Sequence, residues 1–146
     1  DGSASNDAAH MVNEARQAML LARLRKSLEP FGCDTAPMEM TARDALRLAT
    51  RGGAEVLGRQ HDIGQITAGY CADLALFDLD TLPMAGGAVH DAVGSLLLCA
   101  SAPARHTVVH GRRVVRDGQL TTVDMGPLIE RHNRLAAQLA DSARTA

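Results

Sequence analysis

The order of hydrophobic periodicities limits the possible folds of this chain more than any other feature. Apolar residues recur at helical spacing through residues 8–58, and short β-branched runs typical of strands follow. Strands and helices do not alternate as they do in an α/β barrel. The chain has 146 residues, far fewer than the roughly 250 of a complete barrel. An α+β arrangement is therefore expected.

The first helix is predicted over residues 8–25. Small or apolar side chains recur there on one face, as in an amphipathic helix. The residues before it are rich in turn and cap formers. Ser5, Asn6 or Asp7 can cap its free N–H groups.

A second helix is expected to begin after Thr41. Asp44 follows three residues later, which indicates a short variant of the capping box. The glycine pair at 52–53 has two interpretations: it breaks this helix, or it lets another backbone come close. A helical turn resumes over residues 54–57.

Strand patterns dominate after residue 58. Residues 62–66 are predicted to be a short extended piece, and residues 73–77 a continuous apolar strand buried on both faces. A short helix is expected over residues 91–99. The sequence thus changes from helices to mixed short elements.

A β-hairpin or meander is predicted further along the chain. The β-branched runs 105–109 and 112–115 are joined by His110-Gly111, and Asp117-Gly118 forms another tight turn. Residues 125–143 carry apolar side chains at helical spacing, so the chain is expected to end in a helix.

Composition excludes several function classes. The net charge is −2 with mixed signs, and two Phe, one Tyr and no Trp leave little to stack on bases, so no nucleic-acid partner is expected. No apolar run approaches the roughly 18 residues of a membrane span, so no membrane partner is expected. The cysteines are odd in number and widely spaced, which favours reduced thiols in a cytoplasmic protein: Cys33, Cys71 and Cys99.

Asp1 is the strongest candidate for chemistry. Gly2 and a run of small polar residues follow it and lead into the first helix. A carboxylate at the rim of a barrel has such surroundings, because small residues let the loop turn without covering the site. A solvated cap or turn is the alternative from the residues alone.

The histidines do not form a metal motif. His106 and His110 are four residues apart, which on a strand separates them by ~13 Å, too far for one ion. No H-x-H or H-E-x-x-H sequence occurs. His10 is nearest to Asp1, and the others are isolated: His61, His90 and His132.

Three stretches resemble one enzyme family. Residues 1–17, DGSASNDAAHMVNEARQ, resemble the loop and helix after the eighth barrel strand in the amidohydrolase superfamily. The resemblance is to the chlorohydrolase and cytosine-deaminase-like branch, closest to 8-oxoguanine deaminases and hydroxyatrazine-aminohydrolase-like enzymes. Residues 64–78 resemble the G-x-I-x-x-G-x-x-A-D-L…D signature of the flanking β-sandwich. Residues 109–118 resemble its V-N-G-x-x-V hairpin, with His110 in place of Asn.

The resemblance covers almost the whole chain and implies an α/β parent, a metal-dependent barrel with a flanking β-sandwich. Residues 1–58 would be the end of the barrel, residues 59–123 the C-terminal part of the sandwich, and residues 124–146 a C-terminal helix. The family's H-x-H motif, later histidines and proton-shuttling Glu would precede residue 1. We therefore expect the chain to be a C-terminal piece of a longer enzyme.

The resemblance also implies a function. Asp1 would bind a catalytic zinc, with iron as an alternative metal, and accept a proton from the attacking water, while Ser3, Ser5 and Asn6 would support it. The reaction would be hydrolytic deamination of a purine or related amino-azine, with 8-oxoguanine giving urate and ammonia as the best candidate. The intact enzyme would be a homo-oligomer.

Two other functions stay open. The parent could hydrolyse a cyclic amide or a hydroxyatrazine-like substrate instead, or the chain could be a non-catalytic structural module. Asp73 is assigned a structural role, because a carboxylate between a turn and an apolar strand is expected to bond backbone amides.

Overall fold

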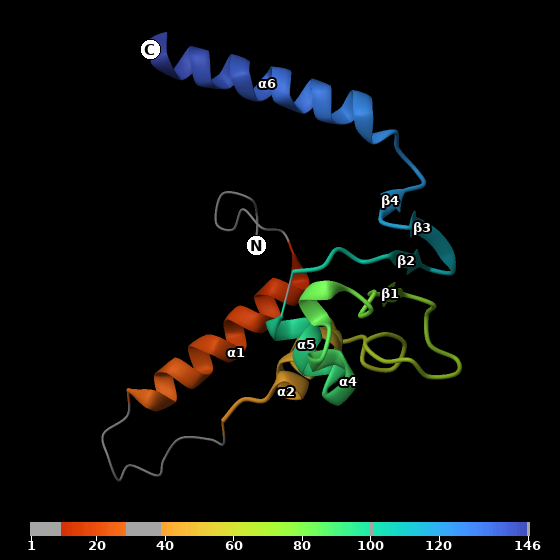
Figure 1. Ribbon diagram of the computed structural model, residues 1–146. Helices are drawn as coiled ribbons and strands as arrows, with labels where there is room; N and C mark the ends of the chain where they lie inside the picture. Colours follow the sequence, from red (N-terminus) through yellow and green to blue (C-terminus); the bar gives the residue numbers. More distant parts are fainter. Residues whose placement is uncertain (1–9, 29–38, 100, 146) are drawn as a thin grey trace. The chain divides into compact units, whose positions relative to one another are not determined.

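The structure is a computed structural model that describes residues 10–28, 39–99 and 101–145 (Figure 1). The order of elements is α1 (Met11–Ser27), α2 (Ala42–Arg47), the π-helical turn η1 (Leu48–Gly52), α3 (Gly53–Val56), β1 (Leu74–Leu76), the 3₁₀ turn η2 (Leu82–Met84), α4 (Gly87–His90), α5 (Ala92–Leu98), β2 (His106–Val109), β3 (Arg112–Arg116), β4 (Gln119–Leu120) and α6 (Met125–Thr145). Helices followed by antiparallel strands confirm the predicted α+β appearance.

The described residues belong to two compact units. The first contains those up to Ala72 together with Phe77–Pro103, and the second contains Asp73–Leu76 and the residues from Ala104 onward. The predicted division of the intact enzyme at residues 58 and 123 stays a prediction.

The core of the first unit lies between α1, α2 and α5. Met19 is completely buried there, and Ala15 of the same helix, Ala45 of α2 and Leu97 of α5 complete the buried cluster. Burying a side chain of this size contributes about 1.5–3 kcal/mol. The alanines leave room for the helices to approach, so Met19 is the large side chain that fills their junction.

The start of α2 has the predicted capping box. The Asp44 N–H donates to Thr41 Oγ1 at 3.2 Å, and the Thr41 N–H donates to Asp44 Oδ2 at 3.0 Å. The hydrogen bond from the Thr41 hydroxyl is the main cause that lowers the pKa of the Asp44 carboxyl below its usual range. The ionised carboxylate therefore stabilises this helix start.

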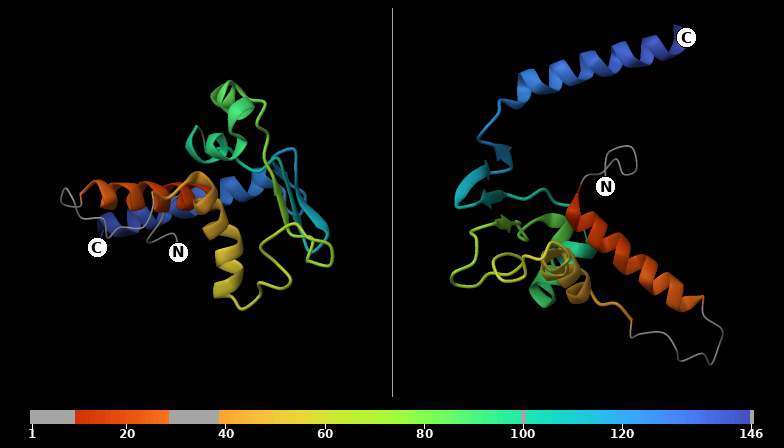
Figure 2. Two further views of the ribbon diagram at one scale, coloured as in Figure 1. Left: turned by 90° about the horizontal axis from the view of Figure 1, so that it is seen from below. Right: turned by 180° about the vertical axis from the view of Figure 1, so that it is seen from behind.

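The glycine pair at 52–53 does not break the second helix. The π-helical turn η1 joins α2 to α3, and these three elements form one continuous helix (Figure 2). The close backbone approach occurs instead at Gly64, which has φ +89°. A Cβ there would lie 2.7 Å from Ala54 Cβ and 3.1 Å from the Thr50 carbonyl oxygen.

The extended piece predicted at residues 62–66 is wrong. The chain passes through turns and bends there, and the N–H groups of Asp62 and Ile63 both donate to the Arg59 carbonyl at 3.1 Å. The close packing of Gly64 on the helix requires a positive φ, which an extended strand does not have. Tertiary packing has therefore overridden the local apolar pattern.

The second unit contains a four-stranded antiparallel sheet in the order β1-β2-β3-β4. The predicted tight turns join β2 to β3 and β3 to β4. Both central residues have positive φ in each turn, 48° and 77° for His110-Gly111 and again for Asp117-Gly118. Type I′ turns have this geometry, and their twist matches that of the strands. The predicted meander is confirmed.

The strand predicted over residues 73–77 forms as β1, but its predicted burial on both faces is wrong. Leu76 is 46% exposed, and Ala75 is exposed as well. Among the described strands, β1 lies at the edge of the sheet and pairs with β2 alone. Within the described part of this unit, no second sheet covers it.

Apolar side chains are exposed on the long helices of both units. Leu21 and Leu24 of α1 and Leu139 of α6 are more than half exposed. No helix in the described ranges is both long and apolar enough to cross a membrane. The predicted final helix is confirmed as α6.

Candidate functional site

The residues predicted to carry chemistry lie outside the described part of the chain. Asp1 is among them, as are the supporting residues Ser3, Ser5 and Asn6. Their roles therefore stay predictions. The structure does describe helix α1, to which this segment leads, and the contacts that the first turn of α1 makes.

His10 is the N-cap residue of α1, and its side chain makes no capping hydrogen bond. The helix thus begins at Met11, later than the predicted residue 8. The His10 side chain instead reaches the carbonyl of Ala102, with 3.2 Å between Nε2 and the oxygen. Because a carbonyl can only accept, Nε2 carries the proton and Nδ1 of the neutral ring is an acceptor.

A second hydrogen bond lies one helical turn further along α1. The Ser101 hydroxyl donates to Asn13 Oδ1 at 2.5 Å. Residues three apart share a helix face, so His10 and Asn13 meet adjacent residues of the segment after α5. We call these four residues, His10, Asn13, Ser101 and Ala102, the α1 clasp.

The His10 ring has one unused polar atom. Nδ1 is buried and has no hydrogen-bond partner among the described residues. Buried polar atoms in proteins are nearly always paired, so an unpaired ring nitrogen indicates a missing partner. The sequence showed that His10 is close to Asp1 but carried no sign of the clasp, whose partners lie about ninety positions away.

The described residues do not by themselves fit a zinc site. In the ranges 10–28, 39–99 and 101–145, no three His, Cys, Asp or Glu side chains gather in a way that could hold a metal ion. A catalytic zinc needs about three protein ligands. The described part of the chain therefore supplies no metal centre of its own.

Asp73 has the structural role predicted for it. Its Oδ1 accepts a hydrogen bond from the His110 N–H at 2.6 Å. The bond fastens the residue before β1 to the β2–β3 turn. His110 has φ 48°, a conformation that Asn, Asp and His adopt more readily than other side chains. This explains how His can stand at the position of Asn in the V-N-G-x-x-V signature that this hairpin resembles.

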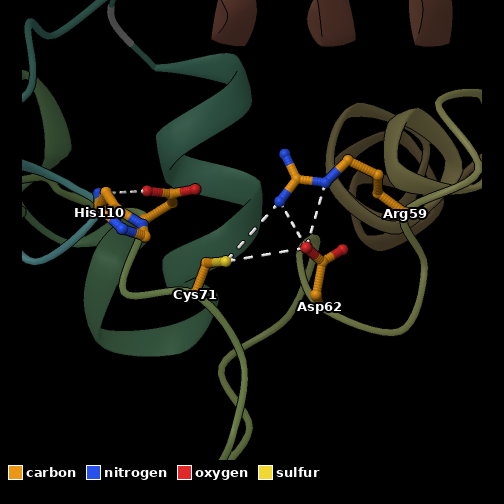
Figure 3. Close-up of polar contacts among 5 residues, drawn as sticks. Arg59, Asp62, Cys71 and His110 are labelled. Atoms are coloured by element: carbon orange, nitrogen blue, oxygen red, sulfur yellow. Dashed lines mark hydrogen bonds and ion pairs between the residues drawn. The ribbon is translucent and has the colours of Figure 1, made fainter.

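Arg59, Asp62 and Cys71 form a polar cluster in the first unit (Figure 3). The Arg59 guanidinium donates to Asp62, and its Nη2 lies 3.7 Å from Cys71 Sγ, which is 3.8 Å from Asp62 Oδ2. The hydrogen bond with Arg59 is the main cause that lowers the pKa of Asp62, and it raises the pKa of Arg59 in turn. The Cys71 N–H also donates to the Asp62 carbonyl at 2.8 Å. The cluster therefore closes the loop between α3 and β1.

A pocket of about 260 Å³ lies beside this loop, and several of its polar groups bond one another. Gln65 donates to the Tyr70 hydroxyl at 2.8 Å, and that hydroxyl donates to the Gln60 carbonyl at 3.1 Å. These bonds hold the loop in shape.

His106, in the second unit, also has a hydrogen-bond partner, because its Nδ1 accepts from the Asp117 N–H at 3.2 Å.

Comparisons with known proteins define the family. Residues 1–115 match the Amidohydrolase family. The chain is 46% identical over 139 residues to an 8-oxoguanine deaminase of Pseudomonas aeruginosa, covering 95% of this chain and 28% of that protein. It is 38% identical over 144 residues to a 5-methylthioadenosine/S-adenosylhomocysteine deaminase of Natronomonas pharaonis, covering 98% of this chain and 31% of that protein.

Solved structures agree. A zinc-bound adenosine deaminase of Xanthomonas campestris is 29% identical with a TM-score of 0.79, over 100% of this chain and 30% of that one. A zinc complex of an atrazine chlorohydrolase from Arthrobacter aurescens is 33% identical with a TM-score of 0.75, over 92% of this chain and 28% of that one. The helices and the antiparallel sheet of this chain are therefore similar to parts of both solved structures. The chain belongs to the amidohydrolase family.

The chain spans about three tenths of the length of these relatives. The segment that begins at Asp1 lies inside the family match, as the resemblance of residues 1–17 implied. The names of these relatives describe whole proteins, so activity, substrate and metal are proposals for this chain.

Proposed function

We propose that these residues form the C-terminal part of a metal-dependent hydrolase that removes an amino group as ammonia from a purine or related amino-azine ring. The observation that carries the proposal is the 46% identity to an 8-oxoguanine deaminase over 95% of the chain. We therefore name 8-oxoguanine, giving urate and ammonia, as the first substrate to test. The intact enzyme would combine an α/β barrel with a β-sandwich.

Zinc is the metal we propose, supported by the zinc in two solved relatives. A bound zinc would make hydroxide available near neutral pH. Asp1 is the ligand that this chain would contribute, and its carboxylate would also accept a proton from the attacking water. Ser3, Ser5 and Asn6 would support that carboxylate by hydrogen bonding.

The same proposal includes the cellular location and the partners of the enzyme. Cys71 and Cys99 are both free, which supports a reducing, cytoplasmic location. The partner would be a small purine-like molecule. A homo-oligomeric intact enzyme stays a prediction of the family resemblance.

A second candidate substrate class has its own support. The 38% identity to a 5-methylthioadenosine/S-adenosylhomocysteine deaminase favours adenine nucleosides, in which the amino group is also on a purine ring. The similarity to the atrazine chlorohydrolase supports an amino-azine as a further candidate substrate. A non-catalytic module is the remaining alternative.

Release of ammonia or, from hydroxyatrazine, of an alkylamine by the full-length gene product tests these alternatives. The substrates would be 8-oxoguanine, guanine, 5-methylthioadenosine, cytosine and hydroxyatrazine, each with zinc-loaded protein. We expect the highest kcat/KM with 8-oxoguanine. Preference for 5-methylthioadenosine would favour the second class, and release of no amine from any of these substrates would contradict the proposed deamination.

A further inference from the structure

The turn between β3 and β4 is bonded back to the start of β2. The Gly118 N–H donates to the Arg105 carbonyl at 2.9 Å. The Asp117 N–H donates to His106 Nδ1 at 3.2 Å. Two adjacent amides of one turn thus have two different kinds of acceptor. A carbonyl oxygen remains an acceptor throughout the neutral pH range, whereas a histidine ring nitrogen can take up a proton.

Protonation of the His106 ring removes one of these acceptors. In the neutral ring Nδ1 accepts from the Asp117 N–H, so Nε2 carries the proton. Both nitrogens of a protonated ring are donors, and two N–H groups cannot bond each other. Histidine is the side chain whose charge ordinarily changes between about pH 5 and pH 8. The contact between Asp117 and His106 is therefore sensitive to pH, and the neighbouring contact of Gly118 is not.

The charged groups around His106 do not replace the lost acceptor. Its Nε2 lies 3.8 Å from Asp117 Oδ1. The carboxylate of Asp117 also lies 3.5 Å from Arg105 Nε and 3.8 Å from Arg116 Nε. On β1, the residue opposite His106 is the uncharged Leu76. A protonated ring is attracted to the carboxylate through Nε2, which keeps the ring beside the turn but leaves Nδ1 a donor.

We propose that His106 is a pH-sensitive latch of the sheet: the neutral ring holds the β3–β4 turn through the Asp117 N–H, and the protonated ring releases it. The turn depends on such bonds for two reasons. Asp117 has φ 48°, a conformation that is costly for a residue other than glycine. β4 has only two residues, so its pairing with β3 resists opening weakly. The latch is independent of the proposed catalytic activity.

Amide hydrogen exchange of the full-length gene product, resolved to single residues, tests the latch at pH 8 and pH 5. Each rate is divided into the intrinsic rate of an unstructured peptide at the same pH, which gives a protection factor. We expect the protection factor of the Asp117 amide to fall about fivefold or more from pH 8 to pH 5, as for one lost hydrogen bond. The Gly118 amide is an internal control, because its acceptor is a carbonyl, and its protection factor should change by less than about twofold.

Two substitutions separate the acceptor from its protonation. His106→Asn places an amide oxygen near the position of Nδ1 and so keeps an acceptor that does not titrate. The Asp117 amide of this variant should be protected equally at pH 8 and pH 5. His106→Phe keeps a ring without an acceptor, so the Asp117 amide should be poorly protected at both pH values. His132→Asn, at an exposed histidine of α6, is the matched control and should behave like the unmodified protein.

An Asp117 protection factor that is the same at pH 8 and pH 5 in the unmodified protein would overturn the proposal. An equal loss of protection in His106→Asn would also overturn it, because acid would then act through another group. Loss at both Asp117 and Gly118 that His106→Asn abolishes would support a latch that releases the whole turn. If a variant does not fold, the unmodified protein decides: loss confined to Asp117 supports the latch, and equal loss at Gly118 contradicts it.

Discussion

Substitution of Gly64 tests how the loop of residues 62–71 packs on the helix formed by α2, η1 and α3. At φ +89° an alanine is strained by about 1–3 kcal/mol. Its Cβ would also lie 2.7 Å from Ala54 Cβ and 3.1 Å from the Thr50 carbonyl oxygen. Neither neighbour is the far end of a flexible side chain, so overpacking adds about 1–3 kcal/mol. Gly64→Ala should therefore lower the free energy of unfolding by about 2–6 kcal/mol.

Two other glycines separate these contributions. Gly69 has φ +88° but open space around its Cβ position, so Gly69→Ala should show only the backbone strain, about 1–3 kcal/mol. Gly53 is helical with open space, so Gly53→Ala should be neutral or stabilise by up to about 1 kcal/mol. Urea unfolding of the full-length gene product, followed by circular dichroism, measures all three. A cost for Gly64→Ala no larger than for Gly69→Ala would refute the close approach.

Two further predictions concern local structure. Thr41→Ala should destabilise by about 1 kcal/mol at neutral pH, whereas Thr41→Ser should not. Since the folded pKa of Asp44 is lowered, its contribution to the free energy of unfolding is present above the ordinary value of 3.8 and is lost as pH falls through the folded pKa. Unfolding curves between pH 7 and pH 2 should therefore show that acid destabilises Thr41→Ala less than the unmodified protein. Equal acid sensitivity of the two proteins would count against the capping box. His110→Asn should leave stability unchanged, and His110→Val should cost about 1–2 kcal/mol at φ 48°. Similar unfolding midpoints for these two variants would contradict the type I′ turn.

Much of the fold could be predicted because its signals are local. Thr41 and Asp44 are three residues apart and complete their capping box without help from the rest of the chain. The turns at 110–111 and 117–118 also depend on which residues tolerate positive φ. The meander and its flanking helices could therefore be predicted from short stretches of sequence.

The failures share a physical cause. The conformation of residues 62–66 depends on Gly64 fitting against Ala54, and the exposure of β1 depends on which elements cover it. The α1 clasp joins His10 to a carbonyl 92 residues away. A backbone carbonyl is present at every residue, so no sequence pattern marks the one that His10 contacts.

The candidate site was predicted from family resemblance more than from local physics. Asp1 followed by small residues is equally typical of a solvated turn, and the signatures at residues 64–78 and 109–118 gave it weight. The family match over residues 1–115 confirms that resemblance. The metal role of Asp1 itself stays a prediction, since that residue lies outside the described part of the chain.

The most direct test of the central claim is the turnover of 8-oxoguanine by the full-length gene product with zinc bound, compared with its Asp1→Asn variant. Ammonia release and bound zinc would be measured on the same samples. We expect the unmodified protein to release ammonia, and Asp1→Asn to lower kcat by about a thousandfold or more with an unchanged unfolding midpoint. Near-normal turnover by zinc-loaded Asp1→Asn would contradict the account.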